Sequence, residues 1–137
     1  MKGKIFTVDE ANRMLPLVSR IADDIVATYG EVNRALQAYE AAKTDAERDP
    51  ALEPELRRRD VEVAEVLDRL QGLIQEVEAL GGTVKEYEQG CIDFYADVGG
   101  SIVYLCWSRG ESAVSHWHNL DEGSGMRRDL PAVNAAA

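Results

Sequence analysis

The chain has 137 residues, of which 45% are hydrophobic and 29% charged, and its formal net charge is −10. This length suits a single domain with its own core, and the composition is typical of a globular protein. We therefore predict one domain over residues 1–137. An acidic surface repels phosphate backbones, so we expect no nucleic-acid partner. No apolar run approaches the roughly 20 residues of a membrane span, so we expect no membrane partner either.

The N-terminus and the cysteines indicate the compartment. The first residues turn acidic after a short apolar stretch, so they lack the apolar core of a secretion signal. Cys91 and Cys106 form no CxxC pair, and we interpret them as buried thiols in a reducing environment. We expect a cytoplasmic protein.

The first long segment is predicted to be helical. Thr7 to Glu10, with the sequence TVDE, has the form of a capping box, so a helix should begin at Val8. Pro16 predicts either a kink or two helices joined near Leu15. Beyond it, apolar or small residues recur in alternating steps of three and four, the pattern of a helix that packs along another helix. These positions are Val18, Ile21, Ile25, Thr28, Val32, Ala35 and Tyr39.

A second helix of similar length should pack against the first. Residues 43–54 contain two prolines and no apolar period, so the chain should turn there. The second helix then runs to Leu80, and Gly81 and Gly82 are suited to end it. Its apolar positions are Leu56, Val63, Leu67, Leu70, Ile74 and Val77. Residues 8–80 thus form a long antiparallel hairpin with arms of about 40 Å. The rest of the domain is too small to cover such arms, so we expect a homodimer through the hairpin.

After the helices the apolar period changes to two, which predicts an antiparallel meander of three to five strands over residues 83–118. Gly99–Gly100 suits a two-residue hairpin turn and fixes the register of the strands on either side. In this register Ile92 faces Trp107, and this apolar face should pack on the helices. The fold class is therefore α+β. The other face is mixed and polar, with Cys91, Asp93, Tyr95, Asp97, Ile102, Tyr104 and Cys106.

The segment SHWH, residues 115–118, adds a further strand, and the length of the loop before it decides which face its histidines occupy. An even loop places His116 and His118 on the apolar face, with Trp107. An odd loop turns Trp117 to that face and both histidines to the polar face. Burial of a tryptophan is favourable, whereas imidazoles on an apolar face need hydrogen-bond partners, so we favour the odd loop. The histidines then share a face with Tyr104, Cys106 and Asp93, with Glu111 at its rim.

Two histidines at positions i and i+2 of a strand can converge on one metal ion. Zinc or iron would need a third protein ligand, for which Asp121, Glu122, Glu111 and Asp93 are candidates. The cofactor stays open, with a divalent transition metal bound through His116, His118, Asp121 and Glu122 as one hypothesis. The simpler alternative is a core tryptophan whose neighbouring histidines are hydrogen-bonded at the sheet rim.

Two further residues each allow a functional interpretation and a simpler one. Cys106 could be a nucleophile activated by a histidine on the adjacent strand, although a buried strand cysteine is the simpler interpretation. Arg127 could contact an anionic ligand or could serve only solubility. Residues 124–137 have little to pack against, so we expect a mobile tail.

Several segments resemble a bacterial domain-of-unknown-function family, number 2203, over nearly the whole chain. They are FTVDEANRMLP, GTVKEYEQGCIDF, VYLCWSRGE and WHNLDEGSGMR. The resemblance implies a small cytoplasmic protein and brings no established activity, cofactor or partner. His116 departs from the family's pattern. Trp117 and His118 are therefore better candidates for a site than the pair of histidines. The recurring positions correspond to Glu10, Ala11, Asn12, Leu15, Pro16, Gly90, Asp93, Phe94, Cys106, Trp107, Gly110, Glu111, Trp117, His118 and Gly123.

The leading functional hypothesis is a binding or regulatory module with a small-ligand pocket at the sheet end, where aromatic walls and a few polar groups can hold a ligand. The candidate ligand-binding residues are Trp107, Glu111, Trp117, His118, Cys106 and Arg127. An alternative is a metal-dependent or acid–base enzyme in which His118 is the ligand or base and Glu111 its carboxylate partner. A second alternative is a purely structural coiled-coil interaction protein. Whether the protein is an enzyme stays open.

Overall fold

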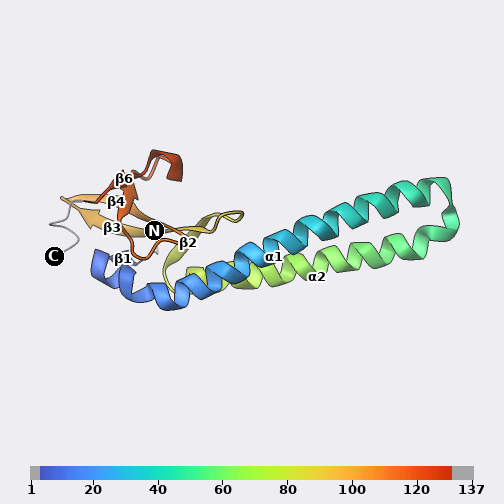
Figure 1. Cartoon of the computed structure of the whole chain (residues 1–137), viewed down its shortest axis with the longest axis horizontal. Helices are drawn as coiled ribbons and strands as arrows, with labels where there is room; N and C mark the ends of the chain where they lie inside the picture. The colour runs from blue at the N-terminus through green and yellow to red at the C-terminus, as the bar shows by residue number, and fades with distance from the viewer. Residues whose placement is uncertain (1–3, 131–137) are drawn as a thin grey trace.

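A helical hairpin that reaches far beyond a small sheet dominates the computed structural model, which describes residues 4–130 (Figure 1). Helix α1 spans Val8–Arg48 and helix α2 spans Glu53–Ala79, with a short 3-10 helix η1 at Pro50–Leu52 between them. The α+β class and the antiparallel hairpin are therefore confirmed. At the rise of an α-helix, α1 is about 60 Å long, longer than we predicted for either arm.

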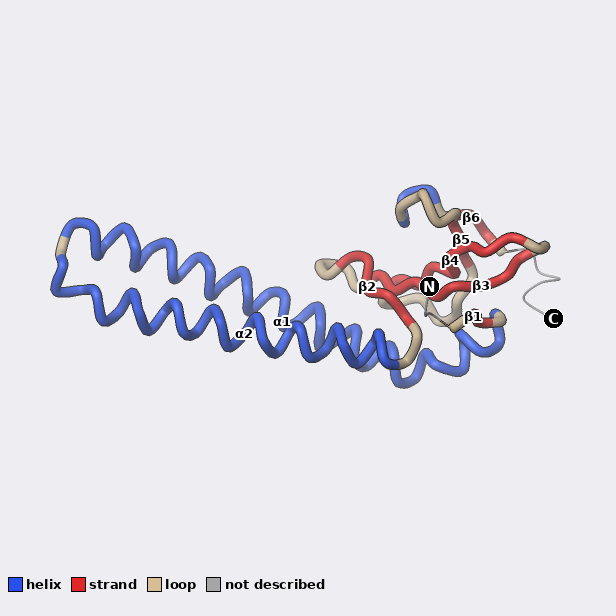
Figure 2. The backbone as a smooth tube through the Cα atoms, turned by 180° about the vertical axis from the view of Figure 1, so that it is seen from behind, coloured by secondary structure: helices blue, strands red, loops and turns tan. Residues whose placement is uncertain are grey.

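The start of α1 follows the sequence closely. The side chain of Thr7 accepts a hydrogen bond from the backbone N–H of Glu10 at 3.0 Å, and the Glu10 carboxylate accepts one from the Thr7 N–H at 2.9 Å. Pro16 lies inside one continuous helix and does not divide it into two. The helix changes direction near its N-terminal end, as an internal proline requires (Figure 2).

The predicted turn over residues 43–54 is too long. α1 continues to Arg48, and only Asp49 and the three residues of η1 separate it from α2. The residues just before Asp49 include good helix formers, and Ala42 and Ala46 are buried, so packing extends the helix to the first proline. At the turn, the Asp49 carboxylate accepts a hydrogen bond from the Ala51 N–H at 3.1 Å.

The contact line between the helices is confirmed on α1 and corrected on α2. Every predicted α1 position except Tyr39 is buried. On α2, however, Val66 is buried with 7% exposure, whereas the predicted Leu67 is 46% exposed. The apolar side of α2 is wider than the strip that α1 covers. Leu67 lies about 100° around the helix from Val66, and therefore on the flank of that strip.

The sheet is a five-stranded antiparallel meander with one short parallel strand added. Its strands are β1 (Ile5–Phe6), β2 (Gly82–Glu86), β3 (Cys91–Val98), β4 (Ser101–Ser108), β5 (His116–His118) and β6 (Arg128–Asp129). Strands β2 to β6 pair in sequence order, and β1 joins β3 in parallel. The predicted register is confirmed, since Ile92 pairs with Trp107 and Val98 with Ser101. Gly99 and Gly100 form the turn with φ of 62° and 88°.

The apolar face of the sheet packs against the helices. One continuous core contains Ile92, Phe94, Leu105 and Trp107 from the sheet together with residues of both helices. In Figure 1 the sheet lies beside the N-terminal part of α1 and the C-terminal part of α2, while the other ends of both helices project away. The sheet thus covers only one end of the hairpin.

The expected mobile tail over residues 124–137 is corrected for its first half. Ser124–Met126 form the 3-10 helix η2, and β6 pairs with β5. The N–H of Leu130 donates to the carbonyl of Ser115 at 2.9 Å. The segment is ordered because β6 pairs with the outer edge of β5. The sequence pattern did not indicate this pairing. Residues 131–137 lie outside the described part of the chain.

Within residues 4–130, neither long helix has a stretch that is apolar enough to cross a membrane.

The packing makes a direct prediction about two leucines. Leu70 is buried between the helices, whereas Leu17 is 47% exposed. We expect Leu70→Ala to lower the free energy of unfolding by about 2–5 kcal/mol, because it leaves a cavity. Leu17→Ala removes the same atoms from an exposed position and should cost less than about 1 kcal/mol. Denaturant unfolding followed by circular dichroism measures both, and equal losses would contradict the observed contact line.

Candidate functional site

The pairing of β5 with β4 settles the direction of the histidines. Trp117 pairs with Leu105, and His116 and His118 pair with Cys106 and Tyr104. Trp117 therefore packs against the core, and both histidines lie on the polar face, as the odd loop predicts. The centre of this face, however, is closed to solvent. His118 is only 1% exposed, whereas His116 is partly exposed.

Three side chains meet in this closed centre, and we call Asp93, Cys106 and His118 the buried trio. The Nε2 atom of His118 lies 2.8 Å from Oδ2 of Asp93, and its Nδ1 lies 2.9 Å from the carbonyl oxygen of Asn119. One nitrogen, oxygen or sulfur atom from each member of the trio lies within 4.8 Å of the others. Asp93 and Cys106 have no exposed surface.

Burial controls the ionisation of Asp93 and Cys106. It raises the pKa of Asp93 above its ordinary value, although the neighbouring His118 acts in the opposite direction. Burial, followed by the negative charge of Asp93, raises the pKa of Cys106 to about 12. Cys106 is thus a neutral thiol at pH 7, and this does not favour the hypothesis of an activated nucleophile. The Asp93 carboxylate also faces the weak thiol donor of Cys106, and its Oδ1 has no N–H or O–H partner among the described residues.

A second polar group lies at the rim of the same face, and we call Ser108, Glu111, His116 and Arg127 the rim network. Nη2 of Arg127 donates to both carboxylate oxygens of Glu111 at 2.8 Å and to Nδ1 of His116 at 2.7 Å. Nη1 of Arg127 donates to Oγ of Ser108 at 3.2 Å, and the Ser108 N–H donates to Glu111 at 2.8 Å. Burial alone would raise the pKa of Glu111, but hydrogen bonds from Arg127 and Ser108 hold it below its usual range.

Glu111 and His118 do not form the predicted pair. Both ring nitrogens of His118 have other partners, Asp93 and Asn119, whereas Glu111 contacts Arg127 and His116. The geometry therefore does not favour an acid–base enzyme built on this pair. Arg127 is likewise engaged within the protein, which leaves its predicted role toward an anion without support.

The predicted metal ligands are also not brought together. Glu122 forms an ion pair with Arg128 at 2.7 Å, which lowers the pKa of Glu122 to about 2, and Asp121 is exposed. His116 belongs to the rim network. Among the described residues, a group with metal-ligand spacing exists only in the buried trio, which keeps His118 and the third-ligand candidate Asp93 and adds Cys106.

An open hollow of about 370 Å³ lies beside the rim network, between α1 and the loop after β4. It is lined by Asn12, Leu15, Pro16, Ser19, Trp107, Glu111 and Ser112, and thus includes two of the predicted ligand-binding residues. Asn12 was missed as a site residue. Its Oδ1 accepts a hydrogen bond from the Val114 N–H at 2.7 Å, across 102 residues of sequence, which no local pattern reveals.

The fold and the site define an α+β protein with a projecting helical hairpin and a buried aspartate–histidine–cysteine cluster in its sheet. The family model described as "Uncharacterized conserved protein (DUF2203)" matches residues 4–130. The chain therefore belongs to this family, as the sequence resemblance indicated. Comparison with curated proteins and with solved structures gave no match.

The rim network predicts a pH-dependent contribution to stability. Since the pKa of Glu111 is lowered in the folded state, its ion pair stabilises the fold above the ordinary glutamate pKa of 4.5. That stability is lost as the pH falls through the lower, folded-state value. We expect Glu111→Gln to lower the free energy of unfolding by roughly 1–2 kcal/mol at pH 7. The difference from the wild type should shrink below about pH 4.

Denaturant titrations across pH 3–8 would measure this effect. Glu88→Gln is the matched control, because it makes the same charge change at an exposed residue of the turn between β2 and β3. A Glu111→Gln penalty that does not change with pH would contradict the role of the ion pair.

Proposed function

We propose that the protein is a non-catalytic binding or regulatory module that self-associates through its helical hairpin. The observation that carries this proposal is an apolar flank of the hairpin that stays partly exposed within residues 4–130. Both cysteines are free thiols, which agrees with the cytoplasmic location that we propose for it.

The apolar flank consists of Leu36 on α1 and Leu67 and Ile74 on α2. Leu36 is 41% exposed and Leu67 is 46% exposed, while Ile74 is partly buried. Leu67 and Ile74 are seven residues apart and therefore lie on the same side of α2. An apolar stripe of this kind on an otherwise charged helix indicates a contact surface.

An ion pair shows that the flank lies on one side of the hairpin. Nη2 of Arg69 contacts Oε1 of Glu31 at 2.8 Å, so residues 31 and 69 lie at the same level. Leu36 is about 140° around α1 from Glu31, and Leu67 is about 160° around α2 from Arg69. Both leucines therefore point away from the ion pair and toward the same opposite side.

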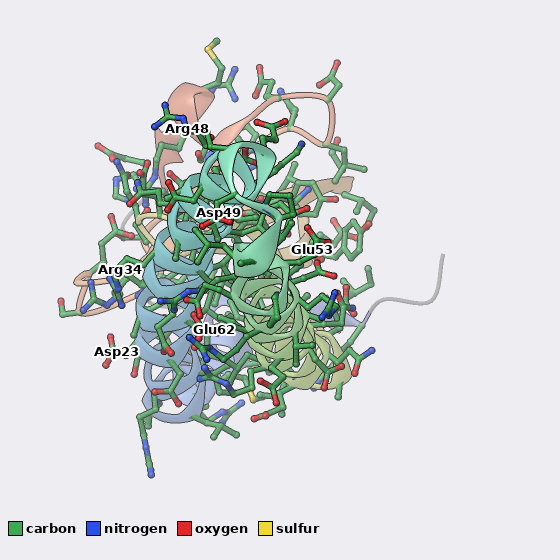
Figure 3. All side chains as sticks on the ribbon, turned by 90° about the vertical axis from the view of Figure 1, so that its right-hand side faces the viewer. Asp23, Arg34, Arg48, Asp49, Glu53 and Glu62 are labelled. Atoms are coloured by element: carbon green, nitrogen blue, oxygen red, sulfur yellow. The ribbon has the colours of Figure 1, made fainter. Side chains whose placement is uncertain are left out.

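The ion-paired side of the arm is strongly charged. Arg59 contacts Glu55 at 3.0 Å and Glu62 at 3.3 Å. In the view onto the tip of the arm, Glu62 lies between the two helices and Arg34 lies outside α1 (Figure 3). This contrast between a charged side and an apolar side is expected where one side faces water and the other is covered.

A second copy of the chain fits the apolar flank better than an unrelated partner. The projecting part of the hairpin buries only one side of each helix, and two hairpins packed by their flanks form a four-helix bundle. A twofold interface is self-complementary, so the same leucines meet in both chains. The acidic charge of −10 is spread over the surface, which favours an interface with an apolar centre over an electrostatic one.

Leu67→Glu tests the proposal. We expect the wild type to have the mass of two chains at micromolar concentration and the variant to have the mass of one, because a charge would be buried at the centre of the interface. Sedimentation equilibrium measures both masses.

Val61→Glu is the matched control, since Val61 is 57% exposed and lies about 120° around α2 from Leu67. It should keep the mass of two chains. A wild type with the mass of one chain, or equal dissociation by both variants, would contradict the proposal.

The hollow beside the rim network is a second candidate, for a small ligand. Its size is within the range of small-molecule sites, and Leu15, Pro16 and Trp107 provide apolar walls. Its polar groups are engaged internally, however, as shown by the bond from Trp107 Nε1 to the Glu111 carbonyl at 3.0 Å. A ligand there would depend on apolar contact. A fragment that shifts the Trp107 indole resonance in NMR spectra would identify one, and no shift from any fragment would argue against the site.

A further inference from the structure

We propose that the buried trio, Asp93, Cys106 and His118, is a binding site for one divalent transition metal ion of the zinc class. This site is separate from the hairpin surface and does not depend on self-association. It also differs from the ligand set that the sequence predicted: His118 and the third-ligand candidate Asp93 are kept, Cys106 is added and His116 is absent.

The geometry of three adjacent strands brings the ligands together. Asp93 on β3 pairs directly with Cys106 on β4, and His118 on β5 pairs with Tyr104, two residues from Cys106. All three side chains point to one face, and their ligand atoms lie within 4.8 Å of one another. In a tetrahedral zinc site the ligand atoms are about 3.5 Å apart, so small side-chain rotations would close the trio around an ion.

The chemistry of the three atoms suits zinc or a similar ion. A thiolate sulfur, an imidazole nitrogen and a carboxylate oxygen are the ligand types of zinc sites. The contact of His118 Nδ1 with the Asn119 carbonyl at 2.9 Å requires a hydrogen on Nδ1, so Nε2, once the proton between it and Asp93 is lost, is the nitrogen that would bind an ion. Such an outer contact is the usual way in which a metal-binding histidine is oriented.

An unpartnered buried oxygen is independent evidence for an ion. No N–H or O–H group of the described residues reaches Oδ1 of Asp93, which is completely buried, and besides His118 its carboxylate faces only the thiol of Cys106, a weak donor. Buried polar atoms of this kind are normally satisfied by protein, water or an ion. A cation held between Asp93, Cys106 and His118 would satisfy this carboxylate.

A divalent ion also satisfies the charge balance of the site. In the absence of an ion, the 2.8 Å contact between Nε2 of His118 and Oδ2 of Asp93 holds one proton, and the thiol of Cys106 holds another. A divalent ion replaces these two protons, and both leave to solvent. The two negative ligands then match the charge of the ion, and no oxidation or reduction takes place.

The test uses the full-length Cys91→Ser variant, in which Cys106 is the only thiol. Because the site is closed, the chain should be unfolded with chelator and refolded with Co²⁺, which reports a thiolate ligand by an intense charge-transfer absorption band. We expect one Co²⁺ per chain after desalting, the thiolate band, and loss of the band when Zn²⁺ displaces Co²⁺.

Matched histidine variants locate the site within the sheet. In the Cys91→Ser background, His118→Gln should reduce retained Co²⁺ at least tenfold, whereas His116→Gln should leave one ion per chain. Absence of retained Co²⁺ in Cys91→Ser, or retention without the thiolate band, would overturn the proposal. Equal losses from both histidine variants would also overturn it. If His118→Gln does not refold, the thiolate band in Cys91→Ser and its persistence in His116→Gln decide the question.

Discussion

The register between β3 and β4 is the constraint on which both faces of the sheet depend. Because side chains alternate along a strand, the pairing of Ile92 with Trp107 places both on the apolar face. The same pairing necessarily places Asp93 opposite Cys106 on the other face. A slip of β4 by one residue against β3 would turn Cys106 toward the helices and Trp107 away from them, and the thiol would no longer share a face with the carboxylate. The hydrophobic core and the buried trio are therefore two results of one register.

Features that depend on neighbouring residues could be predicted from the sequence. The capping box at Thr7, the turn at Gly99–Gly100 and the alternation in β3 and β4 are all local patterns, and the structure confirms each of them. The direction of Trp117 was also predictable, because only one loop parity buries the indole with the core. Local patterns were sufficient here because each of them excludes its main alternative on steric or burial grounds.

Features that join distant segments could not be predicted in the same way. Helical spacing alone does not distinguish Val66 from Leu67 when the apolar side of a helix is wider than its partner's contact strip. The hydrogen bond between Asn12 and the Val114 N–H leaves no pattern in either segment. The hydrogen-bond partner of His118 could not be predicted for the same reason. Register placed Asp93 on the correct face, but only the structure shows that it, and not Glu111, reaches the imidazole.

The polar face consists of two zones with different physical character, and this separates their chemistry. At the rim, Glu111 and Arg127 keep their charges because both are partly exposed and bonded to each other. In the centre, Asp93, Cys106 and His118 are removed from water, so a net charge there is costly unless an opposite charge is enclosed with it. A rim network of this kind can stabilise the fold without any ligand. The centre has three potential ligand atoms and one carboxylate oxygen without an N–H or O–H donor among the described residues, and the proposal of an enclosed cation rests on these.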